Sequence, residues 1–254
     1  MMRTLAACVL CSLVTAPVYA QTRPPRAVGP AADAKWFVSV NAAAQNGAGS
    51  FRDGFTYEAF AETGTIDAEY PGKTAVLVDV AAGRRVWRRL GLAVGFSRAT
   101  ASGGAPVSAR VPHPLYPNQH RDVTGEAGGI DRAETATHVQ LFYDMRPRGK
   151  MRVRLSAGPS FFTAEQQIVE AIETAEVYPY DTTEFRTATV LNASGSGVGI
   201  NAGVDISWML SRRVGVGGLV RFTRSSFDLD ADGSRSVPSD AGGLQVGGGL
   251  RIAF

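Results

Sequence analysis

The chain has 254 residues, a hydrophobic fraction of 44%, a formal net charge of +3 and a pI near 9.0. This composition excludes disordered and collagen-like polypeptides and allows one or two domains. Beyond residue 20 no run of about 18 apolar residues occurs, which excludes a transmembrane helix. The basic residues do not gather on one helix or groove, so the high pI does not point to nucleic acid as a partner.

Residues 1–20 predict a secretory signal peptide, with a basic start at Arg3, an apolar stretch, and a small residue, Ala20, at the cleavage site. Cys8 and Cys11 both lie within this peptide. The exported chain is therefore expected to have no thiol for a disulfide, a metal site or a nucleophile.

Residues 21–34 are rich in Pro, Ala and Gly and predict a flexible periplasmic segment, and residues 35–254 predict the folded domain. In that domain apolar residues alternate with polar or small ones in segments close to the roughly 9–11 residues of a tilted transmembrane strand. The eight segments are Lys35–Gln45, Thr74–Val86, Leu90–Thr100, Thr135–Met145, Met151–Phe162, Gly197–Leu210, Val214–Phe227 and Ala241–Phe254.

The connections between these segments alternate between short and long. Tight turns are expected at 87–89, 146–150 and 211–213, and longer loops at 46–73, 101–134, 163–196 and 228–240. Bacterial outer-membrane barrels combine short periplasmic turns with longer extracellular loops. The pattern predicts an all-β fold, a transmembrane antiparallel up-and-down β-barrel of eight strands with both termini periplasmic. A membrane hairpin in the first loop would raise the count to ten.

The positions of charged residues indicate which of the two alternating sets of side chains in each strand faces the lipid, because an arginine facing lipid at the midplane costs about 2–4 kcal/mol. The favourable phase points polar side chains into the lumen, where they are expected to form a packed ionic network. These residues are Asp79, Arg85, His138, Gln140, Asp144, Arg152, Arg154, Asn201, Asp205, Arg221 and Arg251. Arg84, Arg98 and Arg224 break the pattern, and each is expected near a strand end.

Charge differs between the two predicted ends of the barrel. The turns hold arginine and lysine without acids, which would attract anionic phospholipid headgroups. Loops 47–72, 102–135 and 164–196 are acidic. They carry the aromatic residues Phe51, Phe55, Tyr57, Phe60, Tyr70, Tyr116, Tyr178, Tyr180 and Phe185. Either these aromatics are exposed and bind another surface, or they pack on each other and stiffen the loops.

Two weak candidate sites stand out. Asp228, Asp230 and Asp232 begin like a calcium loop, but Ser239 occupies the position of the closing glutamate, so an ordinary acidic loop is favoured and no cofactor is expected. His138 is the one histidine on a predicted strand and so the one candidate for acid–base chemistry in the lumen. No seryl nucleophile shares its strand face, which favours a non-enzymatic protein.

The last strand ends on Phe254, with Leu250 and Ile252 on the same outward phase. Together with the signal peptide and the eight alternating segments, the ending Gly247–Phe254 resembles the small outer-membrane β-barrel family of OmpA-like, OmpX-like and opacity-type domains. The resemblance implies location in the cell outer membrane, among its lipids and lipopolysaccharide. It also implies that periplasmic chaperones and the barrel assembly machinery act on the chain, which would read the terminal strand, and that no peptidoglycan-binding domain follows.

These expectations favour an integral outer-membrane protein with a filled lumen and a structural or surface-interaction role carried by its loops. A narrow pore for ions or small solutes is the first alternative, and a lipid-modifying enzyme using His138 is the second. A soluble lipocalin-like barrel is disfavoured because it places apolar residues inside and polar residues outside.

Overall fold

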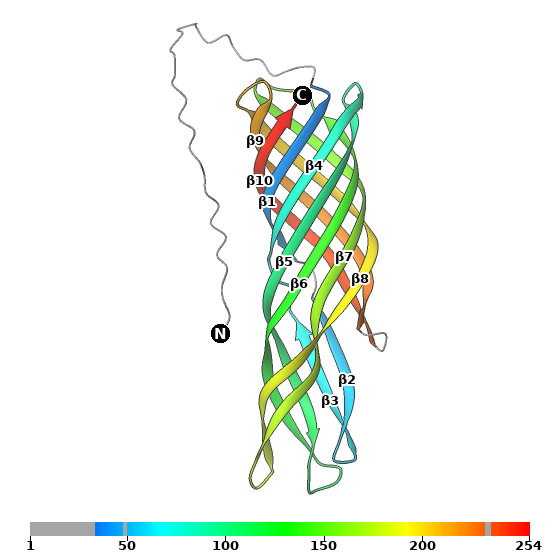
Figure 1. Cartoon of the computed structure of the whole chain (residues 1–254), viewed down its shortest axis with the longest axis vertical. Coiled ribbons are helices and arrows are strands. Elements are labelled where there is room, and N and C mark those ends of the chain that lie inside the picture. The colour runs from blue at the N-terminus through cyan, green and yellow to red at the C-terminus, as the bar shows by residue number, and fades with distance from the viewer. Residues whose placement is uncertain (1–33, 48–49, 232–234) are drawn as a thin grey trace, which may run out of the picture.

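The computed structural model describes residues 34–47, 50–231 and 235–254 (Figure 1). The expected signal peptide, all but the last residue of the expected periplasmic segment, and Asp232 lie outside these ranges. In the described ranges no helix is long and apolar enough to cross a membrane.

The described residues form ten antiparallel strands. They are β1 (Trp36–Asn46), β2 (Phe51–Ala59), β3 (Glu62–Tyr70), β4 (Ala75–Trp87), β5 (Leu90–Pro112), β6 (His120–Asp144), β7 (Met151–Val177), β8 (Thr182–Met209), β9 (Val214–Ala231) and β10 (Arg235–Ala253). Eight of them, all except β2 and β3, close a ring in which each strand pairs with its chain neighbour in the ring and β10 pairs with β1. At the closing seam the Trp36 amide donates to the Phe254 carbonyl at 2.8 Å. The predicted eight-stranded up-and-down barrel is confirmed.

The outer surface of the ring is apolar and its interior is polar. On β4, Val76 is 70% exposed and its neighbour Leu77 is fully buried, and this alternation repeats along the strand. Exposed aromatic residues border this surface at both ends: Trp36, Trp87, Tyr143 and Trp208 beside the turns, and Phe96, Phe161 and Phe222 farther along the strands. An apolar band between two aromatic girdles is the surface that a transmembrane barrel presents to lipid.

Beyond the second girdle the strands do not end. β7 has 27 residues, and an extended strand of that length measures about 90 Å, far more than a bilayer core of about 30 Å requires even when tilted. Most of the residues expected in long loops are therefore strand. We call this part of the chain, residues 50–73, 101–134, 163–196, 228–231 and 235–240, the extension; it forms the lower half of Figure 1.

Two expectations change because the strands continue. Arg98 and Arg224 do not lie near strand ends, since β5 and β9 run on past them. Each lies two residues beyond an aromatic residue of the girdle, where an outward arginine costs only about 0–1 kcal/mol. The hairpin of β2 and β3 stays outside the ring and pairs with β5 from Thr65 to Ala68, so the ten-stranded alternative is wrong.

The interior of the extension is apolar. Pairing of β6 with β7 stops at Arg132 and Gln166, so the hairpins of the extension separate there and their inner faces pack together. The buried cluster includes Ile66, Val107, Ile168, Val169 and Leu229. Because such a core excludes water, the extension has a source of stability of its own, separate from the lipid-facing ring.

Most of the aromatic residues expected in the loops take part in this core. Tyr70 is buried, stacks on Phe51 at 4.4 Å between ring centroids, and its hydroxyl accepts a hydrogen bond from the Val169 amide at 2.7 Å. Burial raises the pKa of Tyr70 to about 12. Phe55, Tyr57 and Phe185 pack against the same cluster. Phe60, Tyr116 and Tyr178 remain exposed, so only a minority of the aromatics are free to meet another surface.

We expect Ile168→Ala to loosen the extension without opening the ring. Ile168 is fully buried, and removing such a side chain typically costs about 2–5 kcal/mol. Hydrogen exchange measured by mass spectrometry should speed up in residues 101–134 and 163–196 and stay unchanged in β1 and β4. The control is Ile200→Ala on the lipid-facing surface, which should leave the extension protected. Unchanged exchange in Ile168→Ala would show that the extension has no cooperative core.

Candidate functional site

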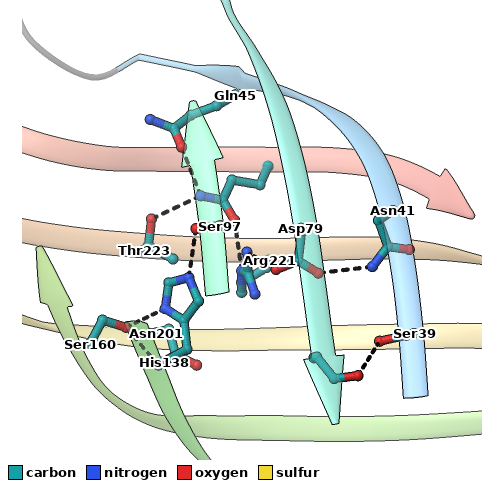
Figure 2. Close-up of polar contacts among 12 residues, drawn as sticks. Ser39, Asn41, Gln45, Asp79, Ser97, His138, Ser160, Asn201, Arg221 and Thr223 are labelled. Atoms are coloured by element: carbon teal, nitrogen blue, oxygen red, sulfur yellow. Dashed lines mark hydrogen bonds and ion pairs between the residues drawn. The ribbon is translucent and has the colours of Figure 1, made fainter. Parts of the chain in front are cut away.

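An ion pair crosses the middle of the lumen. Asp79 on β4 and Arg221 on β9 are each 2% exposed, and the Nη2 of Arg221 donates to Oδ2 of Asp79 at 2.8 Å (Figure 2). Asn41 donates to the other carboxylate oxygen of Asp79 at 2.9 Å, and Nε of Arg221 donates to Gln245 at 2.6 Å. Because β1 and β10 separate these strands in the ring, the pair ties together parts of the wall that share no backbone pairing.

From Arg221 a chain of hydrogen bonds runs toward the extension. The amide of Gln245 donates to Gln45 at 2.7 Å, and the amide of Gln45 donates to Glu134 at 2.8 Å. Arg132 holds the other carboxylate oxygen of Glu134 at 2.8 Å. The network therefore reaches the level where the ring passes into the apolar core of the extension.

Toward the turns, two more ion pairs fill the lumen. Both carboxylate oxygens of Asp144 accept hydrogen bonds from Arg154, at 2.7 and 3.2 Å, and Arg251 contacts both oxygens of Asp205. The guanidinium of Arg154 also lies 3.6 Å from the ring centroid of Phe37, a cation–π contact. Asp79, Asp144 and Asp205 thus each face one arginine, which is the arrangement that makes a buried charge tolerable.

His138 lies in the same layer as the central ion pair (Figure 2). Its Nε2 is 3.0 Å from the hydroxyl of Ser97, and its Nδ1 is 2.7 Å from the hydroxyl of Ser160. Asn201 donates to Ser160 at 2.8 Å and accepts from Gln140 at 2.7 Å. The imidazole is therefore held on both sides within a continuous polar layer.

The two serines were not expected beside His138. They lie on the neighbouring strands β5 and β7, where register places Ser160 directly opposite His138, and not on the strand that carries His138. The alternation of the sequence indicates that both serines face inward, but it does not give the register between strands. A serine–histidine pair can form a nucleophile, yet His138 and Ser160 are fully buried and Ser97 nearly so, which leaves a substrate no contact with them.

The free space inside the barrel is small. One cavity of about 40 Å³ lies beside Asp79, Arg154 and Asp205, and a second of about 40 Å³ lies beside Gln45 and Glu134. Each cavity exceeds the roughly 10–15 Å³ that a single water needs, so each has room for a few ordered waters. The hydrogen-bonded chain from Arg221 through Gln245 to Gln45 runs from the wall of one cavity to the wall of the other.

The remaining predicted residues lie at the ends of the barrel or on its outer surface. Arg85 and Arg152 line a groove at the turn end of the barrel. Asp228 and Asp230 are exposed on β9, in strand conformation where a calcium loop would need a turn, and the described residues hold no group of three histidine, cysteine or acidic side chains that could bind a metal. Leu250, Ile252 and Phe254 are exposed on the apolar outer surface.

We expect Arg221→Ala to lower the free energy of unfolding by about 3–5 kcal/mol, because it leaves the carboxylate of Asp79 buried without its partner. The measurement is denaturant unfolding in lipid vesicles, followed by tryptophan fluorescence. Arg52→Ala is the matched control: it removes an ion pair with Glu69 whose side chains are 80% and 52% exposed, so it should cost less than about 1 kcal/mol. Equal effects of the two substitutions would contradict a stabilising role for the lumen.

No protein-family model and no curated protein sequence matches the chain. Among solved structures, it is similar to Neisserial surface protein A, at 11% identity and a TM-score of 0.46, over 86% of this chain and 97% of that one. It is also similar to OprG from Pseudomonas aeruginosa, at 8% identity and a TM-score of 0.45, over 87% of this chain and 96% of that one. The outer membrane protease OmpT from Escherichia coli is similar at 8% identity and a TM-score of 0.42, over 85% of this chain and 97% of that one. With its closed ring of eight strands, polar lumen and apolar girdled exterior, the chain is a small β-barrel of the outer-membrane type.

Proposed function

We propose that the protein is an integral outer-membrane barrel that is closed to solutes and displays a rigid extension outside the cell for contact with a partner protein. The observation that carries the proposal is the filled lumen. The Asp79–Arg221 pair, the His138 layer and the chain from Gln245 to Glu134 occupy its cross-section, and the two cavities beside them have volumes of only about 40 Å³ each.

Orientation follows from the asymmetry of the two ends. One end has three short, basic connections, and the other carries the extension. Short turns face the periplasm in barrels of this type, which supports an orientation with the extension outside the cell and both termini in the periplasm. In this orientation the apolar band between the two aromatic girdles would contact outer-membrane lipid. The base of the extension, just outside that band, would contact lipopolysaccharide.

Contacts between hairpins make the tip of the extension rigid. Glu62, beside the β2–β3 turn, accepts a hydrogen bond from the Asn118 amide at 2.6 Å. Arg121 on β6 donates to Glu176 on β7 at 3.0 Å, and His113 lies 3.9 Å from Asp181 in the β7–β8 turn. A surface that is already ordered loses little conformational entropy on binding, which favours a role in recognition.

Exposed side chains at this tip have the character of a binding surface. Tyr178 is 83% exposed, and Phe60, Leu115 and Tyr116 on the neighbouring turns are also exposed. Aromatic residues are enriched among the side chains that contribute most to protein interfaces. Residues 164–196 hold six acids and one base, so a partner with basic residues around an apolar patch is favoured over an anionic membrane.

In planar bilayers the wild-type protein should show no stable single-channel steps. The double variant Arg221→Ala/Gln245→Ala removes two large side chains from the central layer and should give small, measurable conductance if the barrel remains folded. Stable steps from the wild type would reject the closed lumen and favour the narrow pore. The folded state of both proteins is checked by their shifted mobility in unheated gel samples.

Orientation can be tested with single cysteines, since both native cysteines lie in the expected signal peptide. Tyr178→Cys should react with a membrane-impermeant maleimide on intact cells. Ser211→Cys, in the exposed β8–β9 turn, should react only after the outer membrane is permeabilised. Labelling of Ser211→Cys on intact cells with protection of Tyr178→Cys would reverse the proposed orientation.

A further inference from the structure

A groove separates two of the short turns at the barrel end opposite the extension. It has a volume of about 730 Å³ and lies between the β4–β5 turn and the segment that joins β6 to β7. The Asp144 amide donates to the Arg89 carbonyl at 2.8 Å, which holds the two connections side by side. The groove is therefore a fixed feature of the barrel end, with a size in the range of small-molecule sites.

The charged side chains that line this groove are mostly basic. Five arginines line it, namely Arg85, Arg88, Arg89, Arg146 and Arg152. Asp144 is the one acid among its lining residues, and both of its carboxylate oxygens are already engaged by Arg154. Nε of Arg85 is buried without a hydrogen-bond partner. Such a cluster of guanidinium groups is suited to a phosphate, whose oxygens they contact in a planar, two-pronged geometry.

The rest of the lining is apolar and faces outward. Trp87, Tyr143 and Met145 line the groove and are exposed on the outside of the ring, in the girdle beside the turns. The guanidinium of Arg88 lies 5.4 Å from the ring centroid of Trp87. Aromatic girdles lie at the level of lipid headgroups. A ligand with a phosphate in the groove could thus extend its apolar part along the barrel wall into the hydrocarbon.

We propose that this groove binds the headgroup phosphate of an anionic phospholipid from the membrane leaflet at the turn end. The arginines hold the phosphate, and Trp87 and Tyr143 contact the glycerol and the first carbons of the acyl chains. The site is separate from the lumen and the extension, so this proposal does not depend on the proposed function. It also differs from diffuse attraction to a charged surface, because it depends on which arginines are present and not only on their number.

The test compares two double variants with the same change in charge. Full-length protein in neutral detergent is titrated with phosphatidylglycerol, and bound lipid is counted by native mass spectrometry. Arg88→Gln/Arg89→Gln should weaken phosphatidylglycerol binding about tenfold or more. Arg212→Gln/Arg213→Gln, on the β8–β9 turn at the same end but outside the groove, should bind like the wild type. Phosphatidylcholine should bind weakly to all three proteins.

Three results would overturn the proposal. Equal losses in both double variants would indicate diffuse attraction, and equal binding of phosphatidylcholine and phosphatidylglycerol would remove the requirement for negative charge. Displacement of the lipid by millimolar inorganic phosphate would indicate a site for a free anion. If Arg88→Gln/Arg89→Gln does not fold, Arg146→Gln replaces it, with Arg148→Gln, which does not line the groove, as its control and the same criteria.

Discussion

The ion pair between Asp79 and Arg221 determines how the centre of the barrel is built. In a ring of eight strands the interior is only wide enough for side chains, so a charge placed there cannot keep a full shell of water. Arg221 meets this constraint by donating hydrogen bonds to both Asp79 and Gln245, and Gln245 in turn donates a hydrogen bond to Gln45. The filled lumen and its small cavities follow from this need to pair every buried charge.

The same constraint explains how the polarity of the interior reverses along the strands. On β5, odd-numbered residues face inward over the whole length, from Ser97 beside His138 to Val107 in the extension. Even-numbered residues are apolar up to Phe96, and from Arg98 onward none of them is a large apolar residue apart from Pro106 and Pro112. Where lipid surrounds the barrel the apolar set faces out, and where water surrounds the extension the apolar set faces in. The same strand thus contacts lipid along one part and water along the other, while its odd-numbered residues face inward throughout.

This reversal marks the limit of what the sequence predicts. The alternation in residues 90–100 identifies a membrane strand correctly, but its inversion after Arg98 resembles the end of a strand, so the pattern predicts a loop over residues 101–134, where Val107 and Glu134 lie. The inward phase of Asp79, Asp205 and Arg221 is readable because a charge in lipid is costly. Which arginine meets which acid, and which serine meets His138, depends on register between strands distant in sequence, and a period of two carries no information about register.

The hairpin of β2 and β3 covers a side of the apolar core that the unequal strand lengths would leave open. β1 and β4 have 11 and 13 residues and end where the extension begins, whereas β5 to β8 continue, so one side of the apolar core would face water. The hairpin fills that position by pairing with β5 on one side. On the other side Asp53 lies 3.3 Å from Arg235 of β10, whose guanidinium also lies over Phe55. Two strands outside the ring thereby replace the two that stop, and the core stays enclosed.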